Sequence, residues 1–189
     1  MATKKKILSY RVGARDLATC NSFVGDVAYR VRGKVDIFTD NYSPYIAVVP
    51  RHFHHTLLNF ATIEKEYATA SDPKRPEVRY APAKVKSVIK RVVTGDPDPD
   101  FMTTSHVEKL NQTLRTTCKR YARLTNAHSK AIDFHRWALA IHVVFYNWAR
   151  RHETMKMTPA QASGISECRL TVKDMLYLDM WEAEEPLVA

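Results

Sequence analysis

Two acidic side chains stand where α/β proteins place metal or phosphate chemistry. Asp40 ends a predicted strand at residues 35–40, and the turn-forming residues 41–44 follow at once. Open α/β sheets bind ligands at the carboxyl ends of their strands, so Asp40 is a candidate catalytic residue and metal ligand. An aspartate that only hydrogen-bonds the turn backbone suits the same position, and position alone favours that simpler role.

The second candidate, Glu108, opens a strongly basic segment. Residues 109–132 contain no acid and six Lys or Arg side chains. At about 100° per residue, Glu108 shares a predicted helix face with Arg115 and Lys119. Such a face can hold a divalent cation on the carboxylate and bind phosphates with the neighbouring cations. The alternative, favoured by these residues alone, is a first-turn glutamate that stabilises the helix dipole before a solvated basic face.

Asp40 and Glu108 are by themselves too few for a two-metal site. Such sites hold two Mg²⁺ ions about 3.5–4 Å apart on oxygen ligands and usually need three or more carboxylates. The cluster of His52, His54 and His55 has no Cys or acid at ligand spacing, which argues against zinc. The three cysteines are far apart, which predicts free thiols and a reducing, cytoplasmic compartment.

The elements that would position these acids form a mixed α/β part. Strands at 7–12 and 35–40 flank a helix that Asp16 caps and Gly33 ends, which predicts a βαβ crossover in a partly parallel sheet. The other elements expected in this part are a helix from Pro44 to Pro50, a short helix or strand within 51–67, a polar loop at 69–78 and a strand at 85–93.

A helical part follows the proline-rich acidic segment 95–100. Apolar residues from Val107 to Leu124 recur at helical spacing, which predicts one helix capped by Thr104 or Ser105. Further helices are expected at 130–152 and 172–181. We expect residues 1–100 and 101–189 to be two parts of one domain.

The overall charge favours a polyanionic partner. The chain has 189 residues and a formal net charge of +9, with 29 Lys and Arg against 20 Asp and Glu. This balance favours nucleic acid before a membrane surface. The longest apolar stretch, 137–148, is shorter than the roughly 20 residues that a membrane span requires. No membrane partner is therefore expected.

Several motifs occur along the chain in a single order. They are Thr39-Asp40, Val92-Val93-Thr94-Gly95-Asp96-Pro97, Thr104-Ser105-His106-Val107-Glu108-Lys109-Leu110-Asn111, Leu124-Thr125-Asn126-Ala127-His128-Ser129-Lys130, Tyr146-Asn147 with Arg151-His152, and Thr158-Pro159-Ala160 with Ala162 and Gly164. Together they resemble the catalytic part of a DDE-type insertion-sequence transposase, which has an RNase H-like core. The resemblance extends from about Gly13 to Asp174.

The resemblance implies a fold, a reaction and roles for residues. The fold would be an α/β, RNase H-like mixed sheet with flanking helices, its first strand missing or incomplete, and a helical C-terminal part. Asp40 would match the second catalytic Asp and Glu108 the Glu, both as ligands of Mg²⁺ or Mn²⁺ in a two-metal site. DNA would be the substrate and partner, within a homo-oligomeric assembly. The side chains implied to bind DNA are Arg115, Lys119, Arg120, Arg123 and Lys130.

The chain also departs from the family pattern. The first catalytic Asp belongs on a strand before residue 7, where this sequence has no acid, and Asn41 stands where the family commonly has Gly. The enzyme hypothesis therefore has an alternative, a catalytically inactive DNA-binding or oligomerising remnant that inhibits an intact transposase. A basic helical scaffold that binds RNA is a third class, which no RNA motif in the sequence supports.

Overall fold

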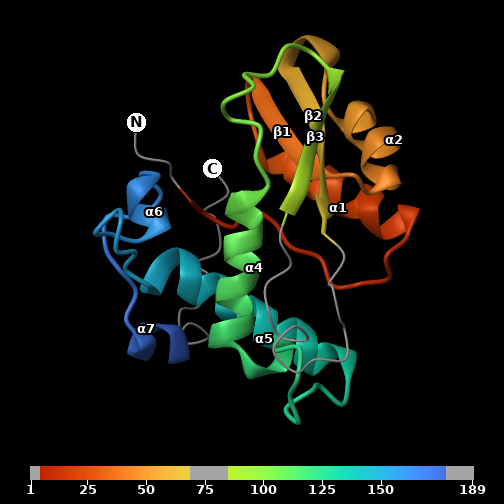
Figure 1. The fold of residues 1–189 in the computed structure, drawn as a ribbon. Coiled ribbons are helices and arrows are strands. Elements are labelled where there is room, and N and C mark those ends of the chain that lie inside the picture. Colours follow the sequence, from red (N-terminus) through yellow and green to blue (C-terminus); the bar gives the residue numbers. More distant parts are fainter. Residues whose placement is uncertain (1–4, 69–84, 178–189) are drawn as a thin grey trace. The chain divides into compact units, whose positions relative to one another are not determined.

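The computed structural model describes residues 5–68 and 85–177, which belong to two compact units (Figure 1). One unit is Ser9–Glu108, and the other combines Met1–Leu8 with Lys109–Ala189. The predicted polar loop at 69–78 and the end of the last predicted helix lie outside the described residues.

The first unit is built on a three-stranded mixed sheet. Its strands are β1 (Val35–Asp40), β2 (Leu58–Tyr67) and β3 (Val85–Thr94), in the order β1-β2-β3. β1 runs parallel to β2, and β3 runs antiparallel to β2. The predicted α/β class with a mixed sheet and flanking helices is therefore confirmed at this level. The parallel crossover connects β1 to β2, one strand later in the chain than the sequence predicted.

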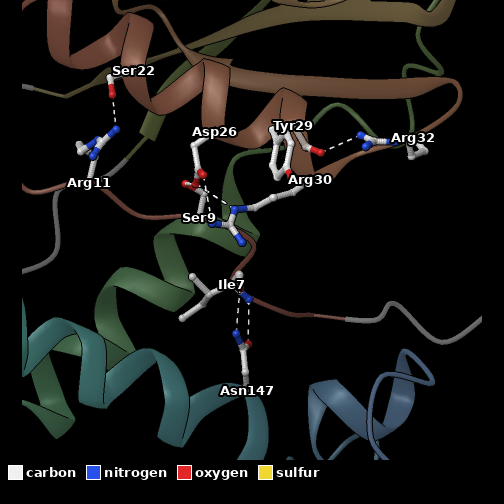
Figure 2. Close-up of polar contacts among 9 residues, drawn as sticks. All are labelled: Ile7, Ser9, Arg11, Ser22, Asp26, Tyr29, Arg30, Arg32 and Asn147. Carbon is white, nitrogen blue, oxygen red and sulfur yellow. Dashed lines mark hydrogen bonds and ion pairs between the residues drawn. The ribbon is translucent and has the colours of Figure 1, made fainter. Parts of the chain in front are cut away.

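Residues 7–12 do not form the predicted strand. The side-chain amide of Asn147 occupies both backbone groups of Ile7: Ile7 N–H donates to Asn147 Oδ1 at 3.0 Å, and Asn147 Nδ2 donates to the Ile7 carbonyl at 2.9 Å (Figure 2). Further along, Ser9 Oγ donates to Asp26 Oδ2 at 2.5 Å. The first residue of the run that predicts a strand is therefore bonded to a side chain through both backbone groups, and Ile7 has none left for a sheet.

Two helices cover one side of this sheet, as Figure 1 shows. They are α1 (Leu17–Arg30) and α2 (Ser43–His52). Asp16 caps α1 as predicted, because its side chain accepts a hydrogen bond from Thr19 N–H at 2.8 Å. The predicted end of α2 at Pro50 is wrong, since the helix continues to His52. A proline in the last turn removes only one helical hydrogen bond, which a packed helix tolerates.

The two faces of the sheet bury different residues. On the helix-covered face, Leu58 and Phe60 of β2 pack with Val24 of α1 and with Val48 and Val49 of α2. A one-turn 3₁₀ helix, η1 (His55–Leu57), leads into β2. Side chains alternate along a strand, so the intervening residues of each strand lie on the opposite face. The buried cluster there contains Ala61, Ile63 and Met102, with Phe38 packed against it.

The second unit is helical. The helix α4 (Ser105–Thr117) crosses the unit boundary, and the elements after it are η2 (Lys119–Tyr121), α5 (Ile132–Val144), the π-helical turn η3 (Phe145–Ala149), α6 (Pro159–Ala162) and α7 (Val172–Leu176). The helix predicted over 130–152 is thus divided into α5 and η3. Among the described residues, no helix combines the length and the apolar composition that crossing a membrane requires.

The prediction that one helix continues to Leu124 is wrong, because α4 ends at Thr117 and Cys118 is extended. The last turns of α4 contain three threonines that hydrogen-bond helix carbonyls with their hydroxyls: Thr113 bonds Lys109 O, Thr116 bonds Gln112 O, and Thr117 bonds Thr113 O. β-Branched residues with hydroxyls of this kind weaken a helix locally. Apolar periodicity alone did not reveal that ending.

Candidate active site and basic surface

Glu108 lies in the first turn of α4 and forms an ion pair with the sheet. Lys65 Nζ, near the end of β2, donates to both carboxylate oxygens at 2.6 and 2.8 Å. The buried Thr104 donates its hydroxyl to Glu108 Oε1 at 2.9 Å. These bonds, with Lys65 the larger cause, hold the pKa of Glu108 below its ordinary value. Glu108 is thus an ionised carboxylate in a fixed position.

Asp40 ends β1 and is exposed. Its Cα pairs with that of Ile63 in the parallel ladder, and strand alternation assigns it to the face that carries Phe38. Within residues 5–68 and 85–177, no hydrogen bond or ion pair to the Asp40 carboxylate is recorded. Burial and, secondarily, the Asp40 charge raise the pKa of the Tyr45 hydroxyl. Asp40 therefore presents its carboxylate without a bonding partner in this part of the chain.

Asp40 and Glu108 share a sheet face without touching each other. Ile63, opposite Asp40, and Lys65, which holds Glu108, are alternate residues of β2 and therefore point to the same side. In the part of the chain that the structure describes, no group of three His, Cys, Asp or Glu side chains is arranged to hold a metal ion. The structure thus brings the two acids to one end of one sheet face, with a lysine bound to Glu108.

Two carboxylates suit a particular kind of cation site. Mg²⁺ keeps several waters and is commonly held by one or two carboxylates together with substrate phosphates. Asp40 and Glu108 are carboxylates of that kind, but both oxygens of Glu108 are bonded to Lys65, which would have to leave before an ion could bind there. They do not by themselves supply the larger donor set of a two-ion site.

Lys65 is the residue of this site that the sequence analysis missed. Its ammonium is one side of the pair with Glu108, and its side chain is 21% exposed. One signal was present: β2 changes from buried apolar residues to Glu64, Lys65 and Glu66 at its end. A strand that changes from apolar to charged within two residues is entering a polar site or solvent. The sequence did not reveal which acid Lys65 would meet.

The predicted basic residues divide into two groups. Lys119, Arg120 and Lys130 line one cavity of 570 Å³ in the helical unit, whereas Arg115 and Arg123 do not line it. Lys119 lies on η2, beyond the end of α4, so the prediction that it shares a helix face with Glu108 is wrong. The early end of α4 is the cause, because it turns the chain after Thr117.

The chain was also compared with known proteins. No protein family, curated protein or solved structure matches it.

Replacing Lys65 by methionine will raise the pKa of Glu108 toward its ordinary value of 4.5, because the larger cause of the depression is removed. A carboxylate with a lowered folded-state pKa contributes stability that is present above its unfolded pKa and lost as the pH falls through the folded value. This half-exposed pair contributes at most about 1 kcal/mol. Side-chain carboxyl NMR of Glu108 during an acid titration measures the shift.

The matched control is Lys90→Met. Lys90 pairs with Ile63 across the sheet and lies on the same face, but its ammonium donates to the Pro99 carbonyl at 2.8 Å. This variant should leave the Glu108 titration unchanged. A Glu108 pKa that stays low in Lys65→Met would show that the ion pair is not its cause.

Proposed function

We propose that this chain is a DDE-type transposase protein with an RNase H-like core, which cleaves and joins DNA phosphodiester bonds with Asp40 and Glu108. The observation that supports this most is the placement of both acids on one sheet face, one at the end of β1 and one held by Lys65. The acid-free basic segment that begins at Lys109 supports DNA as the partner.

The sheet is compatible with that proposal. β1 pairs with β2 on one side, and among the described residues it has no strand on the other side. An RNase H-like core would place a further strand with a third carboxylate in the sheet. Under this proposal, the further strand would pair with the free edge of β1. Residues 7–12 do not form that strand.

The chemistry assigned to the residues follows from their charges. A divalent cation, Mg²⁺ or Mn²⁺, would neutralise charge on the scissile phosphate and favour an oxygen nucleophile, first water and then a DNA 3′-hydroxyl. Asp40 and Glu108 would hold that cation. Before DNA binds, Lys65 would keep Glu108 ionised and in position. When DNA binds, the ammonium of Lys65 would leave the carboxylate and pair with a phosphate oxygen instead. Its four-carbon stem and compact charge suit this exchange.

A nicking assay tests the enzyme function. Supercoiled plasmid is incubated with Mn²⁺ and with the wild type, Asp40→Asn or Glu108→Gln. Each substitution should lower nicking at least about a hundredfold, since losing a metal ligand removes several kcal/mol of transition-state stabilisation. Glu66→Gln is the control, because Glu66 bonds Ser87 on the opposite face of the sheet. Nicking that is absent from all the proteins rejects the enzyme function.

The second candidate is a non-catalytic DNA-binding protein that assembles with itself or with an intact transposase and inhibits it. The pairing of Glu108 with Lys65 favours this candidate, since among the described residues it leaves Asp40 as the one unpaired carboxylate of the two. It predicts salt-sensitive DNA binding and a homo-oligomer without Mn²⁺-dependent nicking. Binding assays at two salt concentrations and sedimentation of the protein test the first two properties, and the nicking assay separates this candidate from the enzyme.

A further inference from the structure

The cavity in the helical unit combines positive charge with an aromatic ring. Its volume is 570 Å³, and its lining includes Lys119, Arg120, His128, Lys130 and Phe134. None of the described residues that line it is acidic. This volume lies within the roughly 300–1,000 Å³ typical of small-molecule sites. The cavity therefore combines the size of a small-molecule site with cations that can attract an anion.

The cations of the cavity are available to a ligand. Lys119 and Lys130 are exposed, and no ion pair of either side chain is recorded among the described residues. The guanidinium of Arg120 is held by a hydrogen bond, in which its Nη1 donates to Ser129 Oγ at 3.3 Å. That hydroxyl is itself hydrogen-bonded to His135 Nδ1 at 3.2 Å. Three cations in a concavity whose described lining includes no carboxylate suit a phosphate group.

Phe134 makes the cavity more than a phosphate site. The side chain is 50% exposed although it is large and apolar. Its ring packs edge to face on Trp137, with centroids 5.2 Å apart and planes at 89°, and this contact restrains its orientation. An exposed aromatic ring beside phosphate-binding cations is the combination that proteins use to bind unpaired nucleotides, since every base has a π-face to stack.

We propose that this cavity binds one unpaired nucleotide of a DNA strand, with the base stacked on Phe134 and the phosphate held by Lys119, Arg120 and Lys130. This inference rests on the proposed function for its choice of DNA, and adds that the protein binds a strand end or a distorted site. A base within an intact duplex is stacked and paired, and entering the cavity would require it to leave the helix.

A fluorescent-base assay tests the proposal. The full chain is titrated with a short oligothymidine that carries one 2-aminopurine, and with the duplex of the same strand, in EDTA at constant salt. Stacking on Phe134 should quench the 2-aminopurine emission in the single strand and not in the duplex. Phe134→Leu should weaken single-strand binding about fivefold to a hundredfold, the effect of losing one base–aromatic stack, and leave duplex affinity within about twofold.

Two further variants complete the test. Phe134→Trp retains an aromatic ring and should keep single-strand binding, which separates stacking from a loss of folding. Lys119→Gln should weaken both single-strand and duplex binding and reduce the salt dependence of each. Equal losses for single strand and duplex in Phe134→Leu, or no quenching with the wild type, would overturn the proposal.

The outcome is independent of the nicking assay. Single-strand binding with quenching in a chain that never nicks plasmid supports the cavity and rejects the enzyme. Nicking by a chain that binds single strand and duplex alike, without quenching, rejects the cavity and supports the enzyme.

Discussion

Gly95→Ala will lower the free energy of unfolding by roughly 2–5 kcal/mol, combining left-handed backbone strain with overpacking. Gly95 has φ of +75°, and an added Cβ would lie 2.5 Å from the Leu58 carbonyl oxygen and closer still to Asn59 Oδ1. The Leu58 carbonyl belongs to the backbone of the central strand β2, so it cannot move aside. Asn59 Oδ1 also accepts from Asp96 N–H at 3.0 Å, a bond that the methyl group would displace. Urea unfolding followed by circular dichroism measures the change.

Gly33→Ala is the matched control. Gly33 has φ of +79°, and a Cβ there would meet nothing within 4 Å. Gly33→Ala should therefore lower the free energy of unfolding only by the left-handed backbone strain, roughly 1–2 kcal/mol. Equal losses in the two variants would mean that the close approach to β2 contributes nothing.

Phe60→Ala will destabilise the protein by about 3–5 kcal/mol, as expected for removing a fully buried aromatic side chain. Phe60 is 0% exposed and belongs to the core cluster under the two helices of the first unit. Two effects contribute to this destabilisation: apolar surface is no longer buried, and a cavity remains between β2, α1 and α2. Thermal and urea unfolding of the purified variant provide the measurement.

Phe101→Ala serves as its control, because Phe101 is 68% exposed. Surface substitutions of this kind usually change stability by at most about 0.5 kcal/mol. If the two alanine variants were equally stable, the assignment of Phe60 to the core would be wrong.

Local signals predicted the elements that local interactions stabilise. Asp16 was identified as a cap from residue type and position, and its bond to Thr19 spans three residues. The strands at 35–40 and 85–93 were recognised from apolar, β-branched composition and correspond to β1 and β3. Each of these features is determined by neighbours within about one helical turn or by the composition of one strand.

The errors came from interactions between distant residues. Ile7 has the composition of a strand residue, but Asn147, 140 positions away, bonds both of its backbone groups. The apolar spacing from Val107 to Leu124 continued past the point where threonine hydroxyls bond the last carbonyls of α4. Neither the Asn147 bonds nor the threonine hydroxyl bonds can be recognised in a periodicity pattern, which records side-chain polarity alone.

Residue types and their spacing were enough to predict that Asp40 ends a strand, that Glu108 lies near the start of a helix, and that a run of cations without acids follows it. Only the folded chain shows that Lys65 pairs with Glu108 across 43 positions, and that Lys119, Arg120 and Lys130 line one cavity together with Phe134. The physical reason is that strand alternation and helix ends assign each side chain a direction, but not a partner. Partners depend on which strands pair, in which register, and on where the chain turns after Thr117.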